Sequence, residues 1–336
     1  MKLDLAVIGA GSWGTTAAHL VSHNAPTVLW AREPEIAAEI DERHTNNTYL
    51  PGYQLNPDLH ATNDLAAAVS GADVVLMVVP SHGFRATLEA VAEHVRAWVP
   101  VVSLSKGLEQ DTNFRMTEIV QSVLPGHPYG VLTGPNLAKE ILAGYAAASV
   151  IAMSEHNIAE ELQRVLTTNL FRVYTNRDVI GCELGGCLKN VIAIASGMAD
   201  GLGAGDNTRA AVITRGLSEI ARLGVHMGGE SLTFAGLAGM GDLVATFISP
   251  QSRNRTVGEE LGKGRPIEDI IAEMHMVAEG VKTSKVVVEL GAAYGVEVPI
   301  AEQVYQVCHE GRSAEDAYYG LLARRMQDEM HDIEQV

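Results

Sequence analysis

The stretch Leu3–Gly14, LDLAVIGAGSWG, constrains the fold of this chain more than any other segment. A short, continuous apolar run leads directly into Gly9, Gly11 and Gly14, which have the spacing G-x-G-x-x-G, and an apolar-periodic stretch follows. This pattern predicts a buried strand, a tight turn and a helix, in that order.

Each glycine of this turn has a physical role in binding a dinucleotide. The first allows a tight turn, the second lets backbone approach a pyrophosphate closely, and the third lets the helix pack against the strand. The N-terminus of the helix also offers free N–H groups to an anion. We therefore expect dinucleotide binding at Gly9, Gly11 and Gly14. The alternative is a plain tight turn.

Apolar, β-branched runs alternate with helical patterns through the first half of the chain. Continuous apolar runs suit the strands of a parallel sheet that is covered on both faces. The predicted strands are Leu3–Gly9, Pro26–Trp30, Asp73–Val79, Pro100–Ser105 and Tyr129–Gly134, with two more at 148–153 and 171–175. Helices such as Ser12–His23 and Phe84–Val95 separate them. This order predicts a doubly wound α/β domain of Rossmann type.

Helical periodicity replaces this alternation from Glu183 onward. The chain has 336 residues, and single cores usually stop growing at about 250 to 300 residues. We therefore expect two domains: a dinucleotide-binding domain over residues 1–182 and an all-helical, substrate-binding domain over residues 183–336.

The formal net charge of −17 argues against nucleic acid or an anionic membrane as a partner, because both attract basic surfaces. The three cysteines are scattered, which fits a reducing compartment. The N-terminus does not have the pattern of a signal peptide, and the apolar run Ile141–Met153 falls short of the ~20 residues of a membrane span. We expect a cytoplasmic protein without stable membrane insertion, and a homodimer stays open.

The residues about twenty positions beyond the glycine turn bear on the choice of dinucleotide. NAD-selective sites place an acid there for a ribose hydroxyl, whereas this chain has Arg32 at the strand end and Glu33 next. A guanidinium can bind the 2′-phosphate of NADP through two parallel hydrogen bonds, so Arg32 favours NADP(H). Glu33 could instead bind the ribose of NAD(H), and Arg32 could simply pair with a neighbouring surface acid.

Lys189 stands in the middle of Glu183–Asp200, a helical stretch that is apolar almost all the way round. A lysine in such a place can extend its amine to water. Lys106, however, follows the end of a predicted strand, which is the side where doubly wound folds bind ligands. If both amines face one ligand, desolvation and the second charge lower the pKa of Lys189, which could then act as a base near neutral pH.

The segment SPQSRNRTVGEEL gathers groups that bind anions. Ser252 is a candidate helix N-cap, and Arg253 and Asn254 follow it. A hydroxyl, a guanidinium, an amide and free N–H groups predict an anion site, although a basic helix start can equally face solvent. Upstream, Asp242 follows three glycines whose backbone could approach a ligand, and by itself it is equally a helix cap.

Gly134 and Asn136 follow another strand end on the ligand side, where a simple turn explains them equally well. His19 and His23 have i, i+4 spacing, but no third candidate ligand joins them. We interpret them as residues of a helix surface, and we predict no metal site.

Together these segments resemble the bacterial-type NAD(P)-dependent glycerol-3-phosphate dehydrogenases. The resemblance covers nearly the whole chain and is carried by GAGSWGT, NTYLPG, SLSKGLE, TGPNLAKE, GCLKNVIAIASGMADGLGAGDNTRAAVITRG, AGMGDLVATFISPQSRNR and VAEGVKT. The glycine pattern is common to many dehydrogenases, whereas LKNVIAIASG and SPQSRNR at this separation are far more specific. The resemblance implies an oxidoreductase that interconverts sn-glycerol 3-phosphate and dihydroxyacetone phosphate and supplies glycerol 3-phosphate for glycerophospholipid synthesis.

The resemblance also implies roles for individual residues. Lys189 would be the proton acceptor, and Lys106 would contact both substrate and cofactor. The other implied substrate residues are Gly134, Asn136, Asp242, Ser252, Arg253 and Asn254. The other implied cofactor residues are Ser12, Trp13, Arg32, Ala138, Arg253, Val277 and Glu279. Two positions depart from the family, because Asn136 stands where Ser or Thr is common and Glu33 stands where some members carry a second basic residue.

Two other functions stay open at this point. The 3-hydroxyacid and 6-phosphogluconate dehydrogenases share a glycine-pattern domain, a helical second domain and a catalytic lysine, and they predict a carboxylate substrate. A protein that senses a dinucleotide would bind NADPH without turnover, and this function leaves Lys106, Lys189 and Arg253 unexplained.

Overall fold

The computed structural model describes residues 3–274 and 278–323, and the chain divides into two compact units. Unit 1 runs to Ser105 and resumes over Phe114–Val179, whereas unit 2 comprises Lys106–Asn113 and the chain from Ile180 onward. We expected Lys106–Asn113 to belong to the dinucleotide domain. It groups with unit 2 because Asn190 Nδ2 donates to the Lys106 carbonyl oxygen (3.3 Å) and Leu108 packs in the helical core.

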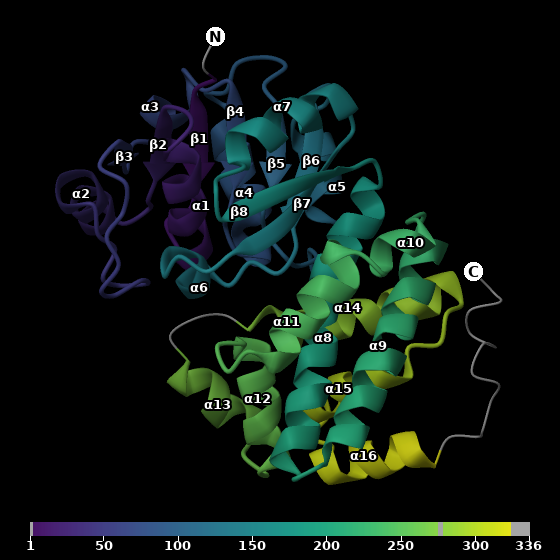
Figure 1. The fold of residues 1–336 in the computed structure, drawn as a ribbon. Helices are drawn as coiled ribbons and strands as arrows, with labels where there is room; N and C mark the ends of the chain where they lie inside the picture. Colours follow the sequence, from purple (N-terminus) through teal and green to yellow (C-terminus); the bar gives the residue numbers. More distant parts are fainter. Residues whose placement is uncertain (1–2, 275–277, 324–336) are drawn as a thin grey trace. The chain divides into compact units, whose positions relative to one another are not determined.

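Unit 1 is built on an eight-stranded sheet within the described residues (Figure 1). The strands are β1 (Leu5–Ile8), β2 (Thr27–Trp30), β3 (Leu59–Thr62), β4 (Val74–Met77), β5 (Val101–Ser103), β6 (Tyr129–Thr133), β7 (Ala147–Met153) and β8 (Phe171–Asn176). Their order is β3-β2-β1-β4-β5-β6-β7-β8, and β1 to β6 are parallel. The predicted doubly wound, Rossmann-type fold is therefore confirmed.

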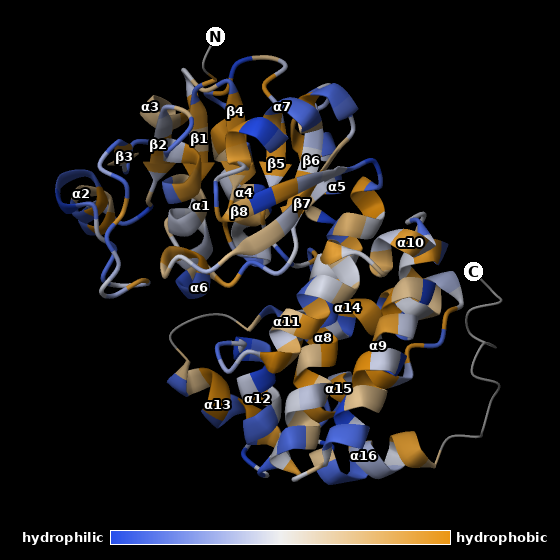
Figure 2. Ribbon diagram, viewed as in Figure 1, coloured by the Kyte–Doolittle hydropathy of each residue, from blue (hydrophilic) through white to orange (hydrophobic). Residues whose placement is uncertain are grey.

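Helices cover both faces of this sheet. They are α1 (Ser12–Ser22), α2 (Pro34–Arg43), α3 (Leu65–Val69), α4 (Ser81–Ala92), α5 (Met116–Val123), α6 (Ala138–Leu142) and α7 (His156–Leu166). Leu5 and Val7 of β1 pack with residues of α1, α2 and α7, whereas Ala6 and Ile8 pack with residues of α3, α4 and α5. Because both faces are buried, the central strands are continuously apolar, as their orange colour in Figure 2 shows.

Two features of the sheet were not predicted. The strand β3 lies at the sheet edge, where only Leu59 of its residues is buried, so its sequence LHAT carries no apolar run. The strand β7 runs antiparallel to β6, with Gly130 opposite Met153. A Cβ on Gly130 would lie 2.3 Å from the Ala152 carbonyl oxygen, so glycine permits this close pairing.

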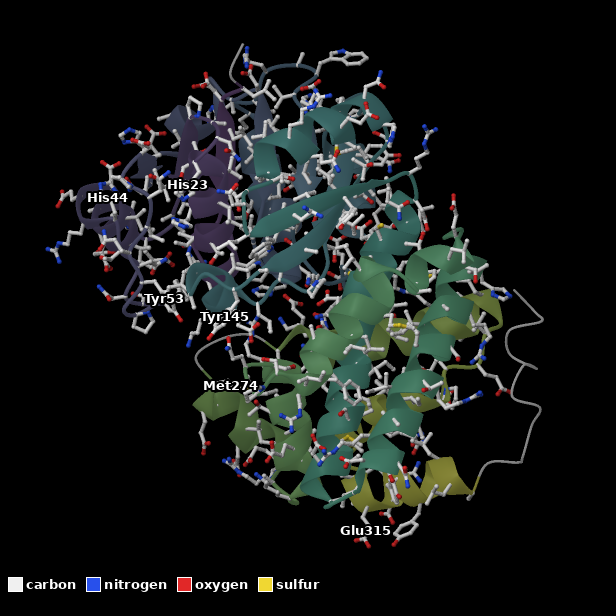
Figure 3. The ribbon with its side chains drawn as sticks, in the orientation of Figure 1. His23, His44, Tyr53, Tyr145, Met274 and Glu315 are labelled. Atoms are coloured by element: carbon white, nitrogen blue, oxygen red, sulfur yellow. The ribbon has the colours of Figure 1, made fainter. Side chains whose placement is uncertain are left out.

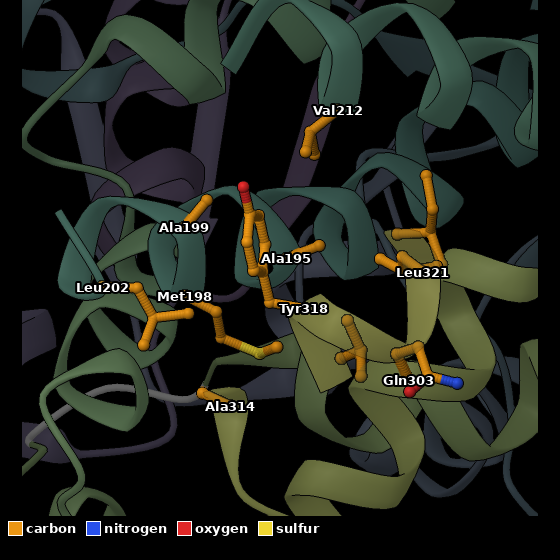
Figure 4. Close-up of a pocket in the computed structure, with 11 residues that line it drawn as sticks. Ala195, Met198, Ala199, Leu202, Val212, Gln303, Ala314, Tyr318 and Leu321 are labelled. Atoms are coloured by element: carbon orange, nitrogen blue, oxygen red, sulfur yellow. The ribbon is translucent and has the colours of Figure 1, made fainter. Parts of the chain in front are cut away.

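From Ile180 onward, the described residues of unit 2 form helices joined by loops, as predicted. Its helices are α8 (Val179–Gly201), α9 (Asp206–His226), α10 (Ser231–Phe234), the π-helical turn η1 (Leu237–Gly241), α11 (Asp242–Ile248), α12 (Arg253–Gly262), α13 (Ile267–Glu273), α14 (Glu279–Tyr294), α15 (Pro299–His309) and α16 (Ala314–Leu322). A small apolar pocket lies among α8, α9, α15 and α16, where Met198, Val304 and Tyr318 are among its lining residues (Figure 4).

The helix α8 is the core helix of unit 2. Among the described residues, Val179–Gly201 and Ser231–Ile248 are both long and apolar enough to cross a membrane by composition alone. The most apolar window of the first is 94% buried inside the protein, and that of the second is 44% buried. Apolar residues on all sides of α8 therefore pack against neighbouring helices.

Candidate active site

The glycine turn of unit 1 has the geometry that a pyrophosphate needs. Gly9 follows β1 with a φ of +116°, and a Cβ on Gly14 would lie 1.8 Å from the Gly9 carbonyl oxygen. At Gly11, by contrast, a Cβ would meet no atom within 4 Å. Gly11 immediately precedes α1, whose first N–H groups have no partner within the helix. The residues present therefore fit a dinucleotide whose phosphates approach this open backbone.

Several buried side-chain polar atoms of unit 1 have no hydrogen-bond partner within the described part of the chain, and two of them lie at predicted site residues. These two are Nε1 of Trp13 and Oδ1 of Asn136. Asn136 does donate from Nδ2 to Ser149 Oγ (3.2 Å). A buried polar atom without a partner is costly, so a bound ligand or water is expected to complete these bonds. The same loop contains Gly134, with a φ of +136°, and Ala138, the first residue of α6.

Arg32 pairs with Glu33 at the end of β2. Its Nε and Nη2 atoms donate to Oε1 of Glu33, at 2.9 and 2.6 Å. The Arg32 side chain is 82% exposed, so this pair lies in solvent and is easily exchanged for another anion. In the structure Arg32 thus pairs with a neighbouring surface acid, which was the alternative to binding a 2′-phosphate.

His19 lies deeper than we predicted. Its Nδ1 accepts a hydrogen bond from the Asn56 N–H (2.9 Å), and burial lowers the pKa of His19 to about 4. His23, which is labelled in Figure 3, is exposed, and the two rings meet edge to face. His19 is therefore half-buried, whereas His23 lies on the helix surface as predicted. No group of three or more potential metal ligands occurs within residues 3–274 and 278–323.

Lys189 and Lys106 meet on one carboxylate in unit 2. Lys189 Nζ donates to Oδ1 of Asp242 and Lys106 Nζ donates to Oδ2, each at 2.6 Å. The exposed fractions of the Lys189 and Asp242 side chains are 8% and 3%. The Lys189 amine is therefore not extended into water.

Close backbone packing places Asp242 beside α8. The π-helical turn η1 ends directly before Asp242, and such turns are frequent at functional sites. A Cβ on Gly185 of α8 would lie 2.8 Å from the Ala238 carbonyl oxygen, and one on Gly239 would lie 2.1 Å from the Phe234 carbonyl oxygen. We expected the glycines before Asp242 to approach a ligand, but Gly239 instead makes room for protein backbone.

The surroundings of Lys189 favour a neutral amine. Burial is the largest influence and lowers the pKa of Lys189 from 10.5 to about 8. The charge of Asp242 opposes this shift, whereas the positive charges of Lys106 and Arg253 add to it. An amine with a pKa near 8 exchanges its proton at modest cost at neutral pH, which suits a general base.

Two further polar residues hold this cluster, and we did not predict either. Thr246 Oγ1 accepts a hydrogen bond from Lys189 Nζ and donates to the Asp242 carbonyl oxygen (2.7 Å). Asn190 links Lys106 to Asn254, because its Nδ2 donates to the Lys106 carbonyl oxygen and its Oδ1 accepts from Asn254 Nδ2 (3.0 Å). A polar residue inside an apolar helix, directly after Lys189, was the available signal for Asn190.

The start of α12 has the predicted cap. Ser252 Oγ accepts a hydrogen bond from the Arg255 N–H (3.3 Å), and Arg253, the first residue of the helix, is exposed. Asn254 Oδ1 accepts from the N–H of Gly280 (2.9 Å), the neighbour of Glu279. Through Asn254, hydrogen bonds therefore connect α8, the start of α12 and the start of α14.

Residues 4–159 match the family described as NAD-dependent glycerol-3-phosphate dehydrogenase N-terminus, and residues 178–319 match the corresponding C-terminus. The chain belongs to the glycerol-3-phosphate dehydrogenase family. Because both domains match, this family is favoured over the 3-hydroxyacid and 6-phosphogluconate dehydrogenases.

Relatives of the family support this assignment over the whole chain. Glycerol-3-phosphate dehydrogenase (NAD(P)+) 2 of Sphingopyxis alaskensis is 59% identical over 331 residues, which cover 98% of this chain and 99% of the relative. The glycerol-3-phosphate dehydrogenase (NAD(P)+) of Mycobacterium avium is 52% identical, over 97% and 96% of the two chains. The crystal structure of glycerol-3-phosphate dehydrogenase from Coxiella burnetii superposes with a TM-score of 0.92 at 37% identity, covering 96% of this chain and 99% of that one.

In this glycerol-3-phosphate dehydrogenase the predicted site residues fall into two groups. Unit 1 contains Gly9, Gly11, Ser12, Trp13, Gly14, Arg32, Gly134, Asn136 and Ala138. Unit 2 contains Lys106, Lys189, Asp242, Ser252, Arg253, Asn254 and Glu279. Val277, which we predicted to contact the cofactor, lies outside the described residues.

Proposed function

We propose that this chain interconverts sn-glycerol 3-phosphate and dihydroxyacetone phosphate with NADP(H), or with NAD(H), and that Lys189 accepts and returns the proton. The observation that carries this proposal is the buried Lys189 amine, which is held by Asp242 and has a pKa of about 8. The nicotinamide, when bound, would exchange a hydride with the substrate carbon.

The hydrogen bonds of Lys189 suit it for proton transfer. A neutral amine has two N–H groups and one lone pair. Asp242 and Thr246 both accept from Nζ, and Thr246 can only accept there because its own proton goes to the Asp242 carbonyl oxygen. The lone pair is then left for the substrate hydroxyl during oxidation. During reduction the same nitrogen, as an ammonium, gives a proton to the carbonyl oxygen, and Asp242 stabilises the charged form.

The start of α12 is the proposed phosphate site. Arg253 offers a guanidinium, Ser252 a hydroxyl, and the helix start offers N–H groups with the positive end of its dipole. We propose that Gly134 and Asn136 complete the contacts to the substrate.

The glycine turn of unit 1 would hold the dinucleotide. Its phosphates would lie against Gly9, Gly11 and Gly14, and Ser12, Trp13, Ala138 and Glu279 would contact the rest of it. Arg32 would bind the 2′-phosphate of NADP(H) in place of Glu33, which makes NADP(H) the preferred cofactor.

A spectrophotometric assay of the purified protein tests the proposal. We expect NADPH oxidation with dihydroxyacetone phosphate, much slower oxidation with dihydroxyacetone, and no NADP+ reduction with 6-phosphogluconate or 3-hydroxybutyrate. In Lys189→Ala, kcat should fall by roughly 10² to 10⁴, the usual contribution of a positioned acid or base. A Lys189→Ala rate within about threefold of wild type would remove Lys189 from the mechanism, and turnover of the carboxylates would favour the rival family.

We also propose a cytoplasmic location and a role in supplying glycerol 3-phosphate for glycerophospholipid synthesis. A homodimer is a further proposal, which light scattering of the purified protein would test. A monomer mass in that measurement would exclude it.

A further inference from the structure

The side chains of the first turn of α12 point to different partners. Ser252 caps the helix, and Asn254 bonds to Asn190 and to the N–H of Gly280. Arg255 turns toward α8, where its Nε and Nη2 both lie 2.8 Å from Oδ2 of Asp200. Arg255 is therefore held by a carboxylate of α8.

The Asp200 carboxylate is buried and shared. Its side chain is 8% exposed, and Arg209 of α9 lies 2.7 Å from the other oxygen, Oδ1. The Arg255 side chain is 24% exposed. An ion pair with this degree of burial is poorly screened by solvent, and losing one partner from it is costly.

The helices α8 and α12 touch backbone to backbone along four glycines. A Cβ on Gly197 would lie 2.0 Å from the Arg255 carbonyl oxygen, and a Cβ on Gly258 would lie 2.0 Å from the Ile194 carbonyl oxygen. One turn further along, Gly201 and Gly262 are in similar contact. We call these four residues the glycine seam.

The glycine seam sets the distance between the two helices but not their register. Helices normally fix their register by inserting side chains between one another, and glycine has no side chain to insert. Polar bonds that join fixed points on α8 and α12 supply the register instead, and Asn254 and Asn190 form one of them beside Lys189. Arg255 and Asp200 provide another such bond, because Asp200 lies between Gly197 and Gly201 on α8 and Arg255 lies three residues before Gly258 on α12.

We propose that Asp200 and Arg255 are positioning residues that fix the phosphate-binding start of α12 relative to Lys189. The inference rests on the proposed function and deepens it. Lys189 lies on the same helix as Asp200, and Arg253 lies on the same helical turn as Arg255. Together with the Asn190–Asn254 bond, the pair thus sets how far the phosphate site is from the proton acceptor, and neither Asp200 nor Arg255 itself contacts the substrate.

Binding of inorganic phosphate to Arg255→Gln tests this without turnover. Asp200 keeps Arg209 in this variant, so its carboxylate is not left alone. We expect the Kd for inorganic phosphate and the KM for dihydroxyacetone phosphate to rise together by about tenfold, since a slightly misplaced helix start weakens a charge-assisted contact. We expect kcat within about twofold of wild type, an unchanged Kd for NADPH, and partial recovery in Arg255→Lys.

Arg265→Gln is the matched control, because it removes an arginine that pairs with Glu260 and Glu273 beyond the other end of α12. It should leave both phosphate measurements unchanged. A fall in thermal stability of Arg255→Gln with no change in phosphate Kd or KM would reduce the pair to a structural role and overturn the inference.

Asp200→Asn separates positioning from direct binding. If Arg255 bound the phosphate itself, removing the Asp200 charge would release Arg255 and tighten phosphate binding. Positioning predicts weaker binding instead, so tighter binding overturns the inference. Turnover of dihydroxyacetone phosphate by the wild type tests the proposed function separately. If the wild type were inactive but Arg255→Gln still raised the Kd for phosphate, the proposed function would be rejected and the positioning role of the pair would stand.

Discussion

At the scale of single residues, the proposed chemistry depends on one amine, that of Lys189, whose pKa is lowered by burial. Lys189 keeps a carboxylate partner, Asp242, which prevents the pKa from falling further. Lys106 shares that carboxylate and supplies a nearby positive charge. The result is a lysine whose pKa of about 8 lies close to physiological pH.

The two reaction directions should therefore depend on pH in opposite ways. Oxidation of glycerol 3-phosphate needs the neutral amine, so its kcat should rise through about pH 8 and level off above it. Reduction of dihydroxyacetone phosphate needs the ammonium, so its kcat should fall above the same pH. In Asp242→Asn the midpoint should move to lower pH, because Asp242 raises the pKa of Lys189. If kcat changed with pH in the same sense for oxidation and for reduction, Lys189 would not be the group that transfers the proton.

Cofactor choice should depend on the exposed pair Arg32 and Glu33. Glu33→Gln removes the acid that occupies Arg32, so the ratio of kcat/KM for NADPH to that for NADH should rise. Arg32→Ala should lower the ratio by roughly ten- to hundredfold, the effect of losing a charge-assisted bond worth about 1.5 to 3 kcal/mol. Steady-state kinetics with both cofactors measure this. A ratio unchanged in Arg32→Ala means that Arg32 does not contact the 2′-phosphate.

At the scale of elements, the candidate site of unit 2 depends on helices whose backbones are in direct contact at glycines, where any larger residue would clash. Gly185 lets η1 approach α8, and the glycine seam lets α12 approach it. Gly280 completes this packing, since a Cβ there would lie 2.5 Å from the Asn190 carbonyl oxygen. Each contact brings a different element toward α8: the Asp242 carboxylate, the start of α12, where we propose the phosphate site, and the start of α14.

Gly258→Ala should therefore destabilise the protein strongly. The new Cβ meets backbone atoms, which cannot rotate away, so α12 must move. We expect a loss of about 1 to 3 kcal/mol or more in the free energy of unfolding, the range for overpacked cores. Gly83→Ala in α4 is the control, because nothing lies within 4 Å of its Cβ and alanine favours helix. Equal denaturation midpoints for the two variants would show that the seam tolerates side chains.

At the scale of the whole molecule, the chain forms two units with separate hydrophobic cores. The core of unit 1 lies on the two faces of the sheet, and the core of unit 2 surrounds α8. The glycine turn proposed to bind the dinucleotide belongs to unit 1, and Lys189, the proposed proton acceptor, belongs to unit 2. Some of the proposed cofactor contacts, such as Glu279, also belong to unit 2.

This division predicts that NADPH binding can be removed without harming the fold. Because the space beside Gly11 is open, Gly11→Val should leave the stability of the free protein within about 0.5 kcal/mol of wild type. NADPH at a hundred times its Kd should stabilise the wild type by about 2.7 kcal/mol. The valine side chain should abolish this gain by filling the phosphate position. Thermal unfolding with and without NADPH measures both effects, and an undiminished gain in Gly11→Val would place the dinucleotide elsewhere.

The sequence by itself determined the doubly wound domain, the helical domain and the residue types of the site, because apolar periodicity and glycine spacing are local properties of the chain. It also indicated Lys189, Lys106 and Asp242 as candidates. Tertiary structure alone decided that one carboxylate joins both lysines, because those residues are far apart in the chain and meet only through backbone packing. The same holds for Asn190, Thr246 and the Asp200–Arg255 pair, whose roles come from partners that no local pattern specifies.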